Sequence, residues 1–142
     1  MTSKSTICIL DDESIVGDRL KPELEDDGFE VEVFTDSAAA ISRLDQTCFD
    51  IFITDLKMEG VDGMGFLEKV KECCPGSEVI MITGYATIET ARESFVRGVY
   101  DFIAKPFRIS DIRESVQKAH RRSRKNRRKS LNSRSSCAGL RP

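Results

Sequence analysis

The chain has 142 residues with a formal net charge of −2, and 39% of its residues are apolar. That length suits one domain with a real core, and this balance of apolar and charged residues is ordinary for a soluble protein. No apolar run is long enough to cross a bilayer, and the apolar residues near the start are too few for a signal peptide. We therefore expect a cytoplasmic protein without a membrane partner.

The small net charge conceals a division along the chain. Residues 1–117 hold 12 basic and 24 acidic residues, whereas residues 118–142 hold 10 basic residues and no acidic one. The segment 121–129 is basic at seven of nine positions and has no apolar side chain to bury. We expect one domain over residues 1–120, followed by a basic, disordered tail over residues 121–142.

The cysteine pattern gives no sign of a structural cross-link. The five cysteines are an odd number, without a C-x-x-C spacing or a cluster of histidines beside them. This predicts neither a disulfide framework nor a zinc site. Cys8 lies in an apolar run, and Cys73 and Cys74 lie near the end of a helical stripe, so we expect small buried or half-buried residues. The single histidine, His120, stands among arginines and is expected to be solvated.

The first elements are a strand, a helix and a second strand. The apolar run at residues 6–10 predicts a strand, and the three carboxylates of residues 11–13 follow it directly. Apolar residues recur every four positions over residues 16–24, which predicts a helix that Gly28 ends. Charged and apolar residues alternate over residues 30–33, as in a half-exposed strand whose charges protect a sheet edge.

The same alternation of strand and helix continues to the end of the domain. Asp36 or Ser37 is placed to cap a second helix. Further helical stripes and apolar runs then alternate: helices at 38–44, 66–74, 88–95 and 109–119, and strands at 51–55, 79–82 and 102–104. The sequence thus predicts five strands and five helices.

Strict strand–helix alternation with short connections predicts an α/β fold. Right-handed crossovers then leave a parallel sheet with helices on both faces as the expected topology. Because only the second strand alternates, we place it at an edge. The prediction is a doubly wound, five-stranded parallel sheet of order 2-1-3-4-5, which is the flavodoxin-like arrangement.

In that topology five polar side chains meet at the rim formed by the carboxyl ends of the strands. They are Asp11, Asp12, Asp55, Thr83 and Lys105. Carboxylates placed together repel unless their pKa rises or a hard cation binds, and oxygen ligands suit Mg²⁺. A carboxylate beside Mg²⁺ and a lysine is a nucleophile in a field that neutralises a phosphoryl group.

These residues resemble the receiver domain of two-component response regulators. The resemblance covers about Thr6 to Ala119. It rests on motifs at four strand ends: Asp11-Asp12, Asp55 with Met58 and Asp62-Gly63, Thr83-Gly84, and Lys105-Pro106-Phe107. The run from Met81 to Ala91 is further similar to receivers of the sigma-54-dependent transcription activators.

The resemblance implies a role for each rim residue. Asp55 would accept the phosphoryl group from a sensor histidine kinase or a phosphotransfer protein. Asp12, Asp55 and the backbone carbonyl of Lys57 would hold Mg²⁺, and Asp11 would act through a bound water. Lys105 would pair with a phosphoryl oxygen. The protein would be a signalling module rather than an enzyme.

It also implies a conformational switch. The hydroxyl of Thr83 would reach the phosphoryl group, and Phe102 would change rotamer with it. The fourth helix, fifth strand and fifth helix would then form the face that signals to a downstream partner or a second copy in a homodimer. The Lys105-Pro106 bond would be cis.

Three positions limit what the resemblance implies. Glu59 stands where the family commonly has proline, which makes the turn after Asp55 less rigid and more negative. Lys57 and Tyr85 occupy variable positions that in this family influence how long the phosphoryl group survives, so its lifetime does not follow from the sequence.

Two other classes of function compete with that of a receiver domain. A magnesium-dependent phosphohydrolase that forms an aspartyl phosphate would have a second aspartate two residues after Asp55, where this chain has Lys57. A nucleic-acid-binding regulator could use the basic tail, but the acidic domain carries no helix-turn-helix, zinc ligands or aromatic RNA-binding strand. We expect no specific nucleic acid partner, and either a stand-alone regulator or the excised receiver of a longer one.

Overall fold

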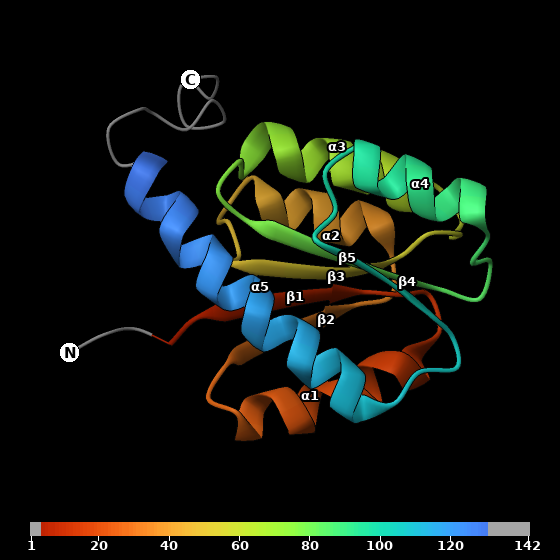
Figure 1. The fold of residues 1–142 in the computed structure, drawn as a ribbon, viewed down its shortest axis with the longest axis horizontal. Coiled ribbons are helices and arrows are strands. Elements are labelled where there is room, and N and C mark those ends of the chain that lie inside the picture. Colours follow the sequence, from red (N-terminus) through yellow and green to blue (C-terminus); the bar gives the residue numbers. More distant parts are fainter. Residues whose placement is uncertain (1–3, 131–142) are drawn as a thin grey trace.

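The computed structural model describes residues 4–130, with side chains up to Ser123, and contains one parallel sheet (Figure 1). Its strands are β1 (Thr6–Leu10), β2 (Glu30–Phe34), β3 (Ile51–Asp55), β4 (Glu78–Thr83) and β5 (Asp101–Ala104). They pair in the order β2-β1-β3-β4-β5, and all four pairings are parallel. The predicted doubly wound fold is confirmed, and β2 is at the edge as its alternating sequence indicates.

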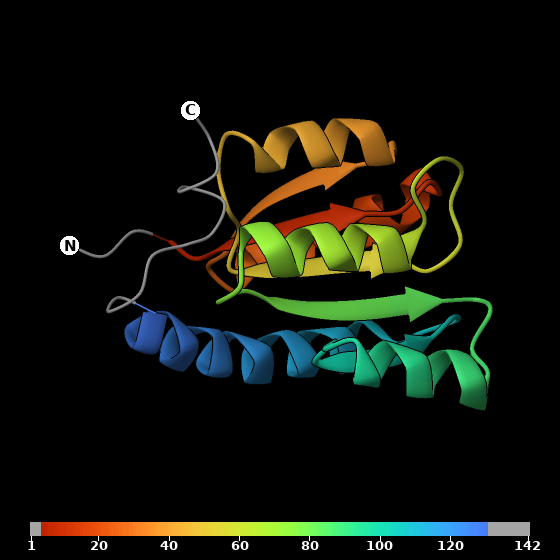
Figure 2. The ribbon, with the colours of Figure 1, turned by 90° about the horizontal axis from the view of Figure 1, so that it is seen from above.

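Five helices cover the two faces of this sheet. They are α1 (Ser14–Asp26), α2 (Ser37–Leu44), α3 (Gly63–Cys73), α4 (Ile88–Val96) and α5 (Ile109–Ser130). Helices α1 and α5 lie on one side of the sheet, and α2, α3 and α4 lie on the other (Figures 1 and 2). The cap of α2 is Asp36, whose side chain accepts a hydrogen bond from the amide of Ala38.

Alternate residues of the central strands build two separate cores. Ile9, Ile53 and Ile80 point to the face where they pack with apolar residues of α1 and α5. Leu10 and Phe52 point to the opposite face and pack with α2 and α3. Because both faces are covered, the strands need apolar residues at every position, which is why they read as continuous apolar runs.

Helix α4 departs from the expected burial. Its stripe of Ile88, Ala91 and Phe95 has the spacing of a core-facing helix, yet Ile88 is 78% exposed and Phe95 is 49% exposed. Ser94 is the buried residue of this helix. The reason is that α4 contacts the short strand β5, which is the last strand of the sheet and offers little surface to cover.

Helix α5 continues through the predicted domain boundary after residue 120, as far as Ser130. The expectation that the basic segment 121–129 has nothing to bury is wrong, because Ser123 is fully buried. Its hydroxyl lies 3.2 Å from the carbonyl oxygens of both Asp50 and Gly76. Polar contacts thus replace the apolar stripe that the sequence lacks here. Residues 131–142 of the predicted tail lie outside the described residues.

The histidine and cysteine predictions also need correction. His120 is half-buried; its Nε2 lies 2.6 Å from the Ser5 hydroxyl oxygen, and its ring stands edge-on to Phe29. Cys8 is buried as expected, but a disulfide joins Cys48 to Cys74. The spacing of the cysteines carries no sign of this pair, because the two residues lie on loops that only the sheet brings together. Within residues 4–130 no helix is both long and apolar enough to cross a membrane.

Candidate functional site

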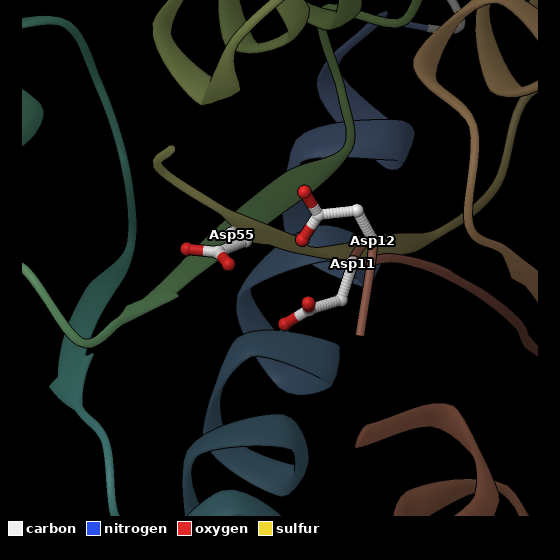
Figure 3. Close-up of side chains that lie close together, drawn as sticks. All are labelled: Asp11, Asp12 and Asp55. Atoms are coloured by element: carbon white, nitrogen blue, oxygen red, sulfur yellow. The ribbon is translucent and has the colours of Figure 1, made fainter. Parts of the chain in front are cut away.

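Three carboxylates meet at the carboxyl ends of β1 and β3 (Figure 3). Asp55 is the last residue of β3, and Asp11 and Asp12 directly follow β1, which pairs with β3. Each of these residues offers an oxygen within 4.8 Å of the others. Asp11 and Asp55 are buried, whereas Asp12 is exposed. The predicted convergence of the three side chains is confirmed.

Lys105, directly after β5, joins this acidic group. Its Nζ lies 2.8 Å from Oδ2 of Asp11, 3.1 Å from Oδ2 of Asp55 and 2.8 Å from Oε1 of Glu13. Burial alone would lower the pKa of Lys105, but the bonds to these three carboxylates outweigh it and raise that pKa. The same contact lowers the pKa of Glu13. Lys105 therefore stays an ammonium ion whose charge is shared among carboxylates.

Asp11 has the least satisfied carboxylate oxygen of the group. Its carboxylate accepts a hydrogen bond from the Glu13 amide through Oδ1, at 2.9 Å. Oδ2 is buried and has the charge contact with Lys105 but no well-aligned hydrogen-bond donor. Desolvation raises the pKa of Asp11 in spite of Lys105, and the nearby charge of Asp55 adds to this. A buried carboxylate oxygen short of donors is a site suited to a hard cation or its water.

The backbone after β3 fixes the orientation of Asp55. Its Oδ1 accepts hydrogen bonds from the amides of Leu56, at 2.6 Å, and Lys57, at 3.4 Å. The chain then turns back so closely that a Cβ on Gly63 would lie 2.2 Å from the carbonyl oxygen of Asp55. Asp62 caps α3 by accepting from the Gly65 amide. This turn places Asp55 at the rim with little freedom to move.

Ser37, at the start of α2, ties down the same loop. Its buried hydroxyl accepts a hydrogen bond from the Val61 amide at 3.2 Å and donates to the Glu59 carbonyl at 3.4 Å. Between them Gly60 has a φ of +79°, a conformation that favours glycine. Sequence reasoning considered Ser37 only as a helix cap. No local sequence pattern around residue 37 predicts its contact with Glu59, which is 22 residues away.

Thr83 and Phe102 lie on adjacent strands near the site. Thr83 ends β4 and is fully buried; its hydroxyl accepts a hydrogen bond from the Tyr85 amide at 2.9 Å. Phe102 is half-buried and packs against the core on the α2–α3 side. It also lines an open pocket of about 470 Å³ between β5 and α5. The bond between Lys105 and Pro106 is cis, as expected.

Of the remaining residues, Lys57 and Glu59 are exposed on the loop after Asp55. The contact of Glu13 with Lys105 was not predicted from the sequence, although Glu13 directly follows Asp11 and Asp12. Its position after β1 was the available signal, since every strand of a parallel sheet ends at this rim.

The chain matches the response regulator receiver domain over residues 7–117. It is 36% identical over 107 residues to a putative NtrX-like response regulator of Rickettsia felis, covering 74% of this chain and 22% of the relative. A CheY-like receiver domain from Methanospirillum hungatei superimposes with a TM-score of 0.82 at 30% identity, covering 87% of this chain and 98% of that one.

A third similar protein is the beryllofluoride-activated NtrC4 receiver domain dimer, whose solution structure gives a TM-score of 0.79 at 27% identity. That match covers 83% of this chain and 98% of the other. The resemblance to receivers of sigma-54-dependent regulators is thereby confirmed, although the chain spans only 22% of the NtrX-like relative. The chain belongs to the response regulator receiver domain family.

Proposed function

We propose that Asp55 accepts a phosphoryl group from the phosphohistidine of a sensor histidine kinase or a phosphotransfer protein. The observation that carries this proposal is the contact of Lys105 Nζ with Oδ2 of both Asp11 and Asp55, at 2.8 and 3.1 Å. It supplies a nucleophilic carboxylate, a second buried carboxylate and a fixed positive charge at one strand rim. That combination suits transfer of an anionic group.

The transfer requires little of the protein beyond positioning. A carboxylate oxygen of Asp55 attacks phosphorus, the P–N bond of the phosphohistidine breaks, and an Oδ–P bond forms. The leaving imidazole takes its proton from solvent. The amides of Leu56 and Lys57 hold the Asp55 carboxylate through Oδ1, and Lys105 offers its charge to a phosphoryl oxygen.

The acidic group fits Mg²⁺ as the cofactor. The poorly satisfied Oδ2 of Asp11 and the oxygens of Asp12 and Asp55, all within 4.8 Å, form a set of hard ligands. Asp12, Asp55 and the backbone carbonyl of Lys57 would hold the ion, and Asp11 would act through a bound water. When bound, the ion neutralises phosphoryl charge that Lys105 alone cannot balance.

The signal then passes from Thr83 and Phe102 to the face formed by α4, β5 and α5. When the Thr83 hydroxyl turns toward the phosphoryl group, Phe102 turns inward, and this shifts the population of two packings. The face already has an open pocket and the exposed side chains of Ile88, Phe95 and Val96. It suits a downstream protein partner or a second copy of the chain.

We infer a cytoplasmic signalling module rather than an enzyme, without a specific nucleic acid partner or a membrane contact. The test is to incubate the full chain with acetyl phosphate, with Mg²⁺ or with EDTA, and to measure its intact mass. One acid-labile phosphoryl group should appear only with Mg²⁺, and Asp55→Asn should abolish it. Asp62→Asn, on the same loop, is the matched control and should still be labelled. Equal labelling of Asp55→Asn at this site would refute the proposal.

A further inference from the structure

At the amino-terminal edge of the sheet, opposite Asp55, a disulfide joins Cys48 and Cys74. Cys48 lies two residues before the end of the loop into β3, and Cys74 follows the last residue of α3. Their Cα atoms are 5.8 Å apart and their sulfurs are joined. That separation is in the range that a disulfide spans without moving the backbone. The phosphoryl transfer proposed above uses neither residue.

The two cysteines differ in accessibility. Cys48 is exposed, whereas Cys74, at the carboxyl end of α3, is only 4% exposed. Cys48 is therefore the thiol that a reagent in solution meets first. Cys8 provides a contrast, because it is 1% exposed and burial raises the pKa of its thiol.

The loops that carry these cysteines are also bound to each other by hydrogen bonds. The Ser77 hydroxyl donates to the carbonyl of Phe49, and the Glu78 amide donates to the carbonyl of Asp50 at 3.1 Å. The sulfur bridge thus closes a contact between the segment that enters β3 and the segment that enters β4.

Helix α5 rests on this pair of loops. The buried hydroxyl of Ser123 lies 3.2 Å from the carbonyl oxygens of Asp50 and Gly76, so it bridges the loop of Cys48 and the loop of Cys74. The preceding residue, Arg122, also anchors the helix here, because its Nε lies 3.1 Å from Oε2 of the buried Glu78. Arg122 also stacks over Tyr100, with its guanidinium carbon 5.5 Å from the ring centroid.

The basic segment 121–129 begins at these contacts. The helix backbone continues past Ser123 to Ser130, so the direction in which the segment leaves the domain depends on how Arg122 and Ser123 sit on the two loops. A change in the spacing of the loops changes both Ser123 contacts at once, because their acceptors lie on different loops.

We propose that Cys48 and Cys74 form a reversible thiol–disulfide site that controls how firmly the carboxyl-terminal part of α5 docks. The co-reactant is a low-molecular-weight disulfide such as oxidised glutathione. The Cys48 thiolate attacks one of its sulfurs, its S–S bond breaks, and one thiolate leaves. The Cys74 thiolate then attacks the Cys48 sulfur and expels the second. Two protein thiols are oxidised, one disulfide is reduced to two thiols, and two protons pass through solvent to those thiols.

The covalent step is tested with the full chain carrying Cys137→Ser, equilibrated in reduced and oxidised glutathione at varied ratio. Oxidation should reduce the number of thiols that can be alkylated by two and lower the mass of the protein by that of two hydrogen atoms. Peptide mapping should identify a disulfide between Cys48 and Cys74. Cys48→Ser and Cys74→Ser should abolish this change, whereas Cys8→Ser and Cys73→Ser should retain it. Absence of the bond at every ratio, or a bond from Cys48 to Cys73 instead, would overturn the site.

The docking step is tested by amide hydrogen exchange over residues 119–130 in the reduced and oxidised protein. Exchange should be slower in the oxidised form by roughly threefold or more, since the loops under the helix are then held together. Ser123→Ala should remove most of this difference without preventing the bond, and Ser110→Ala, an exposed serine of the same helix, should not. Equal exchange in both redox forms would overturn the coupling, and neither result depends on phosphorylation of Asp55.

Discussion

The ammonium group of Lys57 lies 5.8 Å from the centroid of the Tyr85 ring, so a cation–π contact joins the loop after β3 to the loop after β4. These loops follow β3, which ends at Asp55, and the neighbouring strand β4, so we expect that holding them together slows the approach of water to a phosphoryl group on Asp55. Such an exposed contact is worth about 0.5–1 kcal/mol. Lys57→Ala or Tyr85→Ala should therefore speed loss of the phosphoryl group about two- to fivefold, measured by the decay of the phosphorylated mass.

A double-variant cycle identifies the contact as the cause. The double variant should decay no faster than either single variant, because each removes the same interaction. Glu59→Ala changes a charge on the same loop without touching the ring and is the control. Fully multiplicative effects of the two substitutions would show that the side chains act separately.

Thr83→Ala should allow phosphorylation of Asp55 but weaken the conformational response of α4, β5 and α5. The variant loses a hydroxyl that accepts from the Tyr85 amide, at a cost of about 1 kcal/mol in stability, but keeps Asp55 and Lys105. It should gain the phosphoryl group while the amide resonances of α4, β5 and α5 shift less than in the parent. Thr83→Ser retains the hydroxyl and should restore the shifts. A full set of shifts in Thr83→Ala would refute the coupling.

Asp11 should make the metal-free protein less stable as the pH rises. Its pKa in the folded state is raised from the ordinary 3.8, first by burial, so the folded protein binds the proton more tightly than the unfolded chain. Stability is lost as the pH rises through the unfolded and then the folded pKa. Asp11→Asn removes this loss.

In EDTA at neutral pH, Asp11→Asn should unfold at a higher urea concentration than the parent, and the advantage should fade below the unfolded pKa. Mg²⁺ should raise the midpoint of urea unfolding more for the parent protein than for Asp11→Asn. A variant less stable than the parent at neutral pH in EDTA would mean that the contact of Asp11 with Lys105 outweighs its desolvation.

Gly63→Ala should damage the fold at the site itself. The added Cβ would lie 2.2 Å from the Asp55 carbonyl oxygen and 2.7 Å from the Leu56 Cα, and both are backbone atoms that move only with the strand. We expect a loss of about 1–3 kcal/mol in urea unfolding, as for an overpacked core. Gly84→Ala, where nothing lies within 4 Å of the added Cβ, should change stability by no more than about 0.5 kcal/mol. A neutral Gly63→Ala would mean that the turn relaxes.

Much of the fold and the core of the site follow from local sequence. Runs such as Ile51 to Thr54 are apolar at nearly every position because the sheet is covered twice, and Asp55 closes such a run at the binding rim. The convergence of Asp11 and Lys105 on it then follows from topology alone. Predictions of this kind can be made without knowing which side chains are in contact.

The missed features are contacts between residues far apart in the chain. Ser123 is buried because of carbonyls 47 and 73 residues away, and a serine among arginines carries no sign of them. Cys48 and Cys74 are 26 residues apart, on loops whose proximity only the β3–β4 pairing creates. The spacing of the apolar residues of α4 correctly predicts a helix. It does not show whether these residues face the core or, as here beside the short strand β5, stay exposed to solvent.

Strand β3 connects the two sites at which we propose chemical modification. The carbonyl of Asp50, just before it, lies 3.2 Å from the Ser123 hydroxyl, while Asp55 at its far end carries the carboxylate proposed as the phosphoryl acceptor. At the usual rise per residue these ends are roughly 16 Å apart along one rigid, fully buried strand. Phosphorylation of Asp55 and oxidation of Cys48, both as proposed above, would therefore take place at opposite ends of one strand, and a single domain would respond separately to a phosphoryl donor and to an oxidant.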